Sequence, residues 1–395
     1  MDIVKLKDLT VDGKGTYGVA APAVEYQENL PTYLRITDIL DDGTLNLSEL
    51  KSVNVPDSER YMLRPNDIVF ARTGGSTGRN YFYDGTDGAF VYAGFLIKFS
   101  LDPKKVNPKF IKYFCQSEQY KQWVRSFNTG STRGNINAQT FGNMEIALPG
   151  RKQQDHLVSV LESIGKKIKL NKQINDNLEQ QVMTLFRKMF VDTNNDNRYE
   201  CRVDEYFDIS IGKTPPRKES QWFSMNPVDC VWVSISDMGS CGLYISDSSE
   251  YLTHESIERF NVKIVPDNTV ILSFKLTVGR VAITDGDMTT NEAIAHFKTD
   301  KTEINEYLYC YLKEFNYQTM GSTSSIATAV NSKIIKAMPF IVPADDELVE
   351  FHAFAAPMFA MIKANQKENV RLTELRDSLL PRLMSGEIDV SDIQL

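Results

Sequence analysis

The chain has 395 residues, a formal net charge of −8, and contents of 42% hydrophobic and 24% charged side chains. These values are typical of a globular protein with two or more domains. No apolar run is long enough to cross a membrane, and the N-terminus lacks the basic and apolar segments of a signal peptide. The sequence therefore predicts a cytoplasmic protein without a membrane partner.

The charge is distributed unevenly along the chain. Residues 1–150 are neutral overall, residues 151–190 carry a net charge of +4, and residues 191–395 carry −12. An acidic chain has no general attraction for nucleic acid, so nucleic-acid binding would need local basic patches. The five cysteines form no CxxC pair and are expected to be reduced thiols.

Residues 1–150 form the first predicted domain. Short β-branched and aromatic runs such as Asp67–Ala71 alternate with Gly, Asp and Asn turns, which predicts strands. One helix is expected at Pro108–Arg125, and its counterpart in the second half of the chain is expected near Ile304–Phe315.

Residues 151–191 are predicted to form one long helix. Its apolar side chains recur in alternating steps of four and three residues from Leu157 to Met189, which is the spacing of a coiled-coil seam. The two seam positions that interrupt the apolar series are Asn171 and Asn175. A helix of about 36 residues is about 54 Å long, so it would act as a spacer between domains.

Residues 192–343 repeat the first domain. The segment Tyr33–Ile39 reappears as Trp232–Met238, and Asn137 reappears as Asn331. From Asn137 onward the matching residues keep a constant separation of 194 positions through the domain end and into the long helix. A constant separation over several motifs indicates a duplicated domain, and a duplicated protein suits a pseudo-symmetric partner such as duplex DNA.

Residues 344–395 contain the second long helix, which has the same seam. Its seam asparagines are Asn365 and Asn369. An antiparallel pairing of the two helices would set Asn171 opposite Asn369 and Asn175 opposite Asn365, so that each amide meets another amide. A parallel pairing would also match asparagine with asparagine. In both cases the polar pairs would fix the register of the helices.

The sequence contains no catalytic motif that we recognise. The Gly-rich segment Arg72–Arg79 lacks the spacing of a phosphate-binding loop. The four histidines are scattered and form neither an HxxxH pair nor a group with a CxxC, which argues against a zinc site. We therefore expect no catalytic residue, no metal site and no cofactor in this chain.

Three stretches without acids are the candidates for DNA contact: residues 72–79, 119–144 and 315–344. They are rich in Arg, Lys, Asn, Gln and Gly. Arg, Asn and Gln make paired hydrogen bonds to base edges, and Gly lets the backbone approach phosphate. Together with the second Gly-Arg turn, they give as predicted DNA contacts Arg72, Arg79, Arg125, Asn128, Arg133, Asn135, Lys275, Arg280, Ser322, Thr323 and Lys333.

The duplication by itself admits other functions. One alternative is a coiled-coil scaffold that carries two binding modules for partners other than DNA. Another is an enzyme whose active site is built from residues that no known motif describes.

These features together resemble the specificity subunit of type I restriction-modification systems over essentially the whole chain. The resemblance is carried by two strand-rich domains, each followed by a long helix, and by the phrases Leu63–Arg72, Gly130–Thr132, Ile146–Pro149 and Leu379–Ile388. It implies an α+β fold with two pseudo-symmetric target recognition domains joined by a long antiparallel two-helix coiled coil.

The resemblance also implies a division of labour. Each domain would read one half of a split, asymmetric site in double-stranded DNA, and the helices would dock two methyltransferase subunits. Two restriction subunits would be further members of such an assembly. Methylation and cleavage would be carried out by these partners, which would use S-adenosylmethionine, ATP and Mg²⁺.

Overall fold

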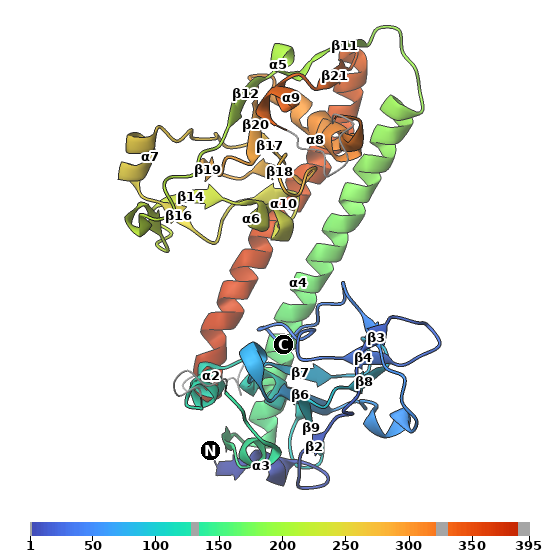
Figure 1. Cartoon of the computed structure of the whole chain (residues 1–395), viewed down its shortest axis with the longest axis vertical. Coiled ribbons are helices and arrows are strands. Elements are labelled where there is room, and N and C mark those ends of the chain that lie inside the picture. Colours follow the sequence, from blue (N-terminus) through green and yellow to red (C-terminus); the bar gives the residue numbers. More distant parts are fainter. Residues whose placement is uncertain (1, 128–133, 321–330, 386–395) are drawn as a thin grey trace. The chain divides into compact units, whose positions relative to one another are not determined.

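The computed structural model describes residues 2–127, 134–320 and 331–385. The chain forms two compact units, of which the first is Met1–Lys166 with Leu372–Leu395 and the second is Lys167–Arg371. Each unit contains one strand-rich segment and parts of both long helices (Figure 1). The units are larger than the predicted domains because they include the helical segments that pack on each domain.

In its described part, the first unit has an antiparallel sheet in the order β2-β9-β6-β7 and a second sheet in the order β3-β5-β4-β8. In the second sheet β4 and β8 run parallel. A separate pair joins β1 to β10. The strands are β1 (Asp2–Lys5), β2 (Thr16–Tyr17), β3 (Val24–Glu25), β4 (Thr32–Leu34), β5 (Lys51–Ser52), β6 (Asp67–Ala71), β7 (Asn80–Tyr83), β8 (Phe90–Tyr92), β9 (Leu96–Ser100) and β10 (Glu145–Leu148).

The second unit repeats this topology. Its sheets have the orders β12-β20-β17-β18-β15 and β13-β16-β14-β19, and β11 pairs with β21. Only β15, at one sheet edge, has no counterpart among the described strands of the first unit. The strands are β11 (Tyr199–Arg202), β12 (Asp208–Ile211), β13 (Phe223–Ser224), β14 (Cys230–Val233), β15 (Tyr244–Ile245), β16 (Tyr251–Leu252), β17 (Val270–Ser273), β18 (Val281–Thr284), β19 (Thr289–Thr290), β20 (Ile294–Lys298) and β21 (Pro339–Val342).

The repeat extends to individual strand partners. Tyr33 of β4 lies opposite Val91 in a parallel pair, and Trp232 of β14 lies opposite Thr289 in the matching parallel pair. The duplication predicted from sequence spacing is therefore present as a duplicated fold.

The helix predicted at Pro108–Arg125 is two helices in the structure. The side chain of Ser117 accepts a hydrogen bond from the backbone N–H of Tyr120 and so starts a second helix after a break. The helix expected near Ile304–Phe315 is confirmed as α8. The helices are α1 (Pro108–Phe114), α2 (Glu118–Arg125), α3 (Ala138–Gly142), α4 (Arg151–Phe186), α5 (Val203–Tyr206), α6 (Ile235–Ser240), α7 (His254–Phe260), α8 (Asn305–Glu314), α9 (Ser332–Lys336) and α10 (Asp345–Ser385).

The core of the first unit lies between the antiparallel sheet and its helices. Phe70 of β6 stacks on Phe141 of α3, with ring centroids 4.7 Å apart. Leu161 of α4 is fully buried in the same cluster, which Leu380 and Leu383 of α10 complete. Both long helices therefore contribute side chains to the core of the first unit.

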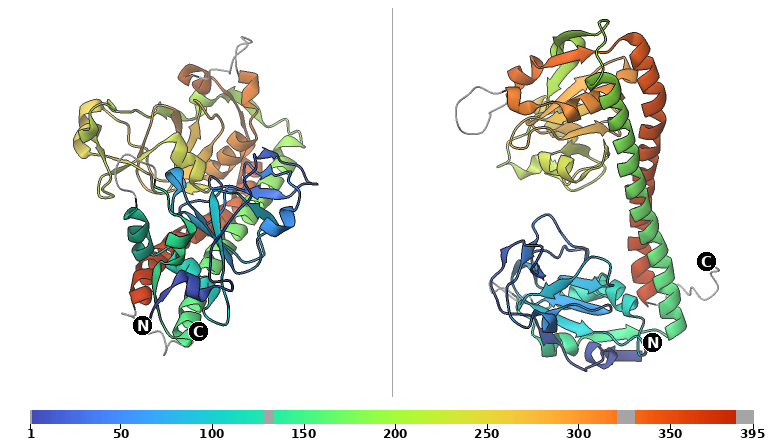
Figure 2. Two further views of the ribbon diagram at one scale, coloured as in Figure 1. Left: turned by 60° about the horizontal axis from the view of Figure 1, so that its bottom comes forward. Right: turned by 90° about the vertical axis from the view of Figure 1, so that its right-hand side faces the viewer.

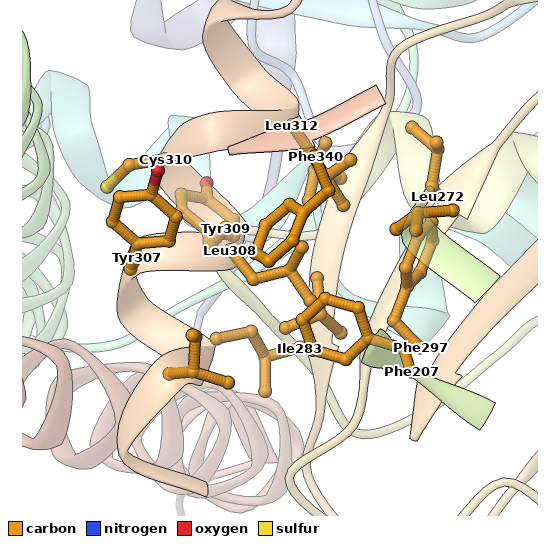
Figure 3. Packing of buried hydrophobic residues seen from close by; sticks show 14 of the residues in the cluster. Phe207, Leu272, Ile283, Phe297, Tyr307, Leu308, Tyr309, Cys310, Leu312 and Phe340 are labelled. Atoms are coloured by element: carbon orange, nitrogen blue, oxygen red, sulfur yellow. The ribbon is translucent and has the colours of Figure 1, made fainter. Parts of the chain in front are cut away.

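The core of the second unit is built in the same way around α8. Tyr307, Leu308 and Leu312 of α8 belong to one buried cluster with Phe297 of β20 and Phe340 of β21 (Figure 3). Val182 and Phe186 of α4, with Phe351, Ala355, Phe359 and Ile362 of α10, belong to the same cluster. The buried side chain at the end of the α4 seam is Phe186, whereas the predicted seam position Leu185 is only half-buried.

The asparagines of the two seams meet in the second unit. Asn171 Nδ2 donates to Asn369 Oδ1 at 3.0 Å and to Glu368 Oε2 at 2.7 Å, and Asn365 Nδ2 donates to Asn175 Oδ1 at 2.8 Å. The two helices are thus antiparallel (Figure 2). The pairing has one imperfection, since Asn171 Oδ1 is buried without a hydrogen-bond donor among the described residues.

A glutamine joins α10 to the sheet of the second unit. Gln366 accepts a hydrogen bond from the backbone N–H of Tyr244 at 3.0 Å and donates to the carbonyl of the same residue at 2.9 Å. The Gln366 amide therefore pairs with the backbone of β15 in the way that a neighbouring strand would. Lys363 and Lys367 add contacts of 3.0 Å to Asp285. Polar contacts as well as apolar packing fix this domain on its helix.

The asparagine pair predicts a coupled effect on stability. Asn175→Leu alone leaves the amide of Asn365 facing an apolar side chain, and we expect a loss of about 1 kcal/mol in the free energy of unfolding. The double variant Asn175→Leu/Asn365→Leu should recover that loss, because two leucines pack in a seam position. Urea denaturation of the four variants of this cycle measures the coupling. Additive losses would show that the two amides do not act as a pair.

Candidate nucleic-acid interface

Two acid-free stretches that are distant in sequence lie together in the first unit. The carbonyl of Arg72, in the turn between β6 and β7, accepts a hydrogen bond from the backbone N–H of Ile136 at 2.9 Å. The next residue, Thr73, forms a β-bridge with Asn135. The structure therefore brings together the predicted contacts Arg72 and Asn135, and the side chain of Asn135 is exposed.

Arg72 contacts one aromatic ring and the backbone of a second aromatic residue. Its guanidinium lies 5.2 Å from the ring centroid of Tyr17, and its backbone N–H donates to the carbonyl of Phe95 at 3.0 Å. Tyr17 is 43% and Phe95 59% exposed. We call Tyr17, Arg72, Phe95 and Asn135 the first-copy cluster. A cation, two exposed aromatic side chains and an amide are groups that bind phosphates and bases.

The two Gly-Arg turns serve the fold. Arg79 donates to both carboxylate oxygens of Asp41, at 2.7 and 3.1 Å, and to the carbonyl of Ile39 at 3.1 Å. Arg280 donates to the carbonyl of Ile235 at 2.5 Å. Each arginine ties its turn to the segment that follows β4 or β14. DNA contact by Arg79 and Arg280 stays a prediction, and hydrogen bonds already occupy part of each guanidinium.

The remaining predicted contacts fall into two groups. Arg125, Lys275 and Lys333 are exposed, and Arg125 forms a surface ion pair of 2.7 Å with Glu118. Such an exposed pair is weak and can exchange its partner for a phosphate. Four other predicted contacts lie outside the described residues: Asn128, Arg133, Ser322 and Thr323.

One buried histidine has the contacts of a nucleophile–base pair. Ser210 Oγ lies 2.9 Å from His296 Nδ1, and His296 Nε2 lies 2.7 Å from Thr290 Oγ1. The ring is fully buried, and burial together with the charge of Lys298 lowers its pKa to about 3. A base with so low a pKa does not take a proton at neutral pH, and a hydroxyl rather than a carboxylate orients the ring. The ring therefore lacks the basicity and the carboxylate partner expected of a catalytic histidine.

The described part of the chain shows no group of three or more His, Cys, Asp or Glu side chains that could hold a metal ion. Within the same residues, no helix combines the length and apolar character that a membrane crossing requires.

Comparison with known proteins decides the family. A family model described as a type I restriction modification DNA specificity domain matches residues 2–180 and again residues 196–373. The chain belongs to the type I restriction-modification specificity subunits. The model matches twice because the specificity subunit carries the duplicated domain and helix found in the structure.

Curated relatives agree with this assignment. The specificity subunit of the type I restriction enzyme HindI from Haemophilus influenzae is 21% identical, over 90% of this chain and 94% of its own length. The specificity subunit of MjaIX from Methanocaldococcus jannaschii is 24% identical, over 72% of this chain and 70% of its own length. The crystal structure of a type I S subunit from M. genitalium has a TM-score of 0.54 at 15% identity, covering 97% of this chain and 95% of that one, so the specificity subunit shares its fold.

Sequence reasoning missed the aromatic members of the first-copy cluster. Tyr17 and Phe95 lie outside the acid-free stretches, and strand patterns alone make such residues look like core. A signal existed at Phe95, because it follows Gly94 in a turn between two buried strands. Nothing local marked Tyr17, whose hydroxyl accepts from the backbone N–H of Ala138 far along the chain.

Proposed function

We propose that this specificity subunit reads a bipartite, asymmetric site in double-stranded DNA, with one recognition domain on each half. The observation that carries the proposal is the duplicated specificity domain, whose first copy presents the cluster of Tyr17, Arg72, Phe95 and Asn135. Two similar scaffolds that differ in their exposed residues suit two different half-sites.

The proposal includes partners and a cellular location. The two long helices, of 36 and 41 residues, would dock two methyltransferase subunits and set the gap between half-sites. Two restriction subunits would join the same assembly. Adenine methylation and cleavage, with S-adenosylmethionine, ATP and Mg²⁺, would belong to these partners, and this chain would be non-catalytic. Five unpaired cysteines support a reducing, cytoplasmic location.

Mapping of methylated adenines in the host genome tests the proposal. Deletion of the gene should remove methylation from a single split motif, and re-expression of this chain should restore it. An unchanged methylation pattern would contradict the proposal. Failure of the chain, assembled with its methyltransferase subunits, to retain any DNA at low salt would instead favour the scaffold with non-DNA modules.

The first-copy cluster predicts a one-sided binding defect. Arg72→Ala in the assembled complex should raise Kd for the complete site about tenfold, because it removes one specific contact. The loss should vanish on DNA whose first half-site is scrambled. Arg60→Ala is the matched control, since Arg60 is 70% exposed in the same domain and its ion pair with Asp57 is long, at 3.8 Å. Equal losses on both half-sites would contradict the division of labour.

A further inference from the structure

The turn between β17 and β18 holds a leucine in a backbone conformation that leucine disfavours. Leu276 has φ +61°. In the described ranges, the other residues with positive φ apart from glycines are Asp57, Asn66, Asn261 and Asn268. Asp and Asn tolerate this conformation because their short polar side chains bond locally, whereas leucine has no such compensation. The Leu276 side chain is 97% exposed, so no burial offsets the cost.

The first copy uses glycine at the matching place. Arg72 N–H donates to the Phe95 carbonyl in the first copy, as Phe274 N–H donates to the Ala293 carbonyl in the second. Two residues beyond these donors lie Gly74, with φ +79°, and Leu276. The turn therefore forms with glycine, and the fold itself does not call for leucine at this position. A strained residue that the fold does not need is a candidate for function.

Each copy exposes one large apolar side chain at this place. In the first copy it is Phe95, which is 59% exposed, whereas its counterpart Ala293 is small and 5% exposed. In the second copy it is Leu276, where the first copy has Gly74. Within each copy, the backbone hydrogen bond described above joins the turn that holds Gly74 or Leu276 to the turn that holds Phe95 or Ala293. The exposed apolar side chain therefore comes from one of these turns in the first copy and from the adjacent turn in the second. The same surface thus presents an apolar group at two different positions.

The surroundings of Leu276 suit an anionic partner. Lys275 precedes it and is exposed. Gly279, at the other end of the turn, lies against Tyr317, whose segment belongs to the acid-free stretch 315–344. The carboxylate of Glu292, which interacts with Lys275, accepts a hydrogen bond from Thr214. The charge of Lys275 offsets that of Glu292, so the exposed apolar tip of Leu276 can approach a DNA groove.

We propose that Leu276 contacts a thymine methyl group in the half-site read by the second copy, and that Phe95 makes the corresponding apolar contact in the other half-site. The inference rests on the proposed function. The thymine methyl is the apolar group that a base pair presents in the major groove, and it identifies A·T pairs there. Leu276 and Phe95 are then specificity-determining residues whose positions differ between the copies.

The test replaces thymine by deoxyuridine, one position at a time, in a duplex that carries the mapped site. The assembled complex of wild-type chain and methyltransferase subunits should lose about fourfold in affinity at one or more positions in each half, the effect of one buried methyl group. Leu276→Gly should bind the unmodified site about tenfold more weakly. The affinity of the Leu276→Gly complex should not change when deoxyuridine replaces thymine in the half-site read by the second copy. It should still fall when the replacement is made in the other half-site. Phe95→Ala should show the opposite pattern.

Two further measurements keep the outcomes distinct. Leu276→Gly should raise the thermal unfolding temperature of the second unit, since glycine relieves the backbone strain, so weaker binding cannot be ascribed to misfolding. Val228→Ala, another exposed apolar residue of the second copy at 80% exposure, should leave binding unchanged. A Leu276→Gly complex that binds like wild type, weakens equally on unrelated DNA, or keeps its deoxyuridine sensitivity overturns the inference. Absence of any split motif for the wild type overturns the proposed function itself.

Discussion

Replacing Arg198 with methionine is expected to destabilise the second unit by about 3 kcal/mol, because it leaves a largely desolvated carboxylate, that of Glu347, without its partner. Arg198 donates to both oxygens of Glu347, at 2.6 and 2.9 Å, and to the carbonyls of Met189, Phe190 and Thr193. The side chains of Arg198 and Glu347 are only 8% and 16% exposed. These contacts join the segment that directly follows α4 to the first turn of α10.

The same ion pair predicts a dependence of stability on pH. The Arg198 hydrogen bond is the main cause that lowers the pKa of Glu347 from 4.5 to about 2. A carboxyl group whose pKa is lower in the folded state stabilises the fold fully above its unfolded pKa. That contribution should fall away between about pH 4.5 and pH 2. Arg198→Met should unfold more easily at pH 7 and lose less further stability over this acidic range.

Chemical denaturation at pH 7 and pH 3 measures both effects. Arg187→Met is the control, because Arg187 forms an exposed ion pair of 2.5 Å with Glu314 on the same helical end. Exposed pairs contribute little, so this variant should resemble the wild type. Equal losses of stability in Arg198→Met and Arg187→Met would show that the burial of the Arg198–Glu347 pair does not contribute to its effect.

The second large effect is expected at a glycine that both copies share. A Cβ atom on Gly212 would overlap Thr290 Oγ1 and the carbonyl oxygens of Thr290 and Asn291, and one on Gly18 would overlap the carbonyls of Tyr92 and Ala93. Most of these are backbone atoms, which cannot move aside. We expect Gly212→Ala to cost about 3 kcal/mol, at the upper end of overpacking effects.

Hydrogen exchange followed by mass spectrometry can localise this loss. Gly212→Ala should expose the amides of β17 and β20 to exchange and leave those of β6 and β9 protected, since each unit has its own core. Gly18→Ala should give the reverse. Gly165→Ala provides the control, because Gly165 is an exposed helical residue with no atom within 4 Å of an added Cβ, and it should stabilise α4 by about 0.5–1 kcal/mol. Exchange that rises in both units with Gly212→Ala would contradict independent cores.

Much of the fold was predictable because its signals are periodic and local. The separation of 194 residues between Asn137 and Asn331 indicates a duplication without any three-dimensional information. The steps of three and four between apolar residues define a helix face, and asparagines on that face need polar partners. The contacts Asn171–Asn369 and Asn175–Asn365 follow from that logic. The break between α1 and α2 was not predicted, because the capping role of Ser117 competes with an uninterrupted helical pattern.

The interface was predictable only in part, because charge and residue type are properties of sequence whereas availability is a property of contacts. Arg72 and Arg79 look equally suited to DNA in the sequence. Arg79 donates hydrogen bonds to both carboxylate oxygens of Asp41, which lies 38 positions earlier in the chain. The guanidinium of Arg72 instead lies over the ring of Tyr17. Long-range partners of this kind have no periodic signature.

Residue spacing along the chain is enough to indicate a duplicated protein with two long helices whose register is marked by asparagines, because duplication and helix periodicity are local, repeating signals. Which side chains remain free to contact a partner depends on the packing of the folded chain. Phe95 and Leu276 are apolar and would be assigned to a core by pattern, yet the turns that hold them place both in solvent. Exposure depends on how the whole chain packs, so no local run of residues encodes it.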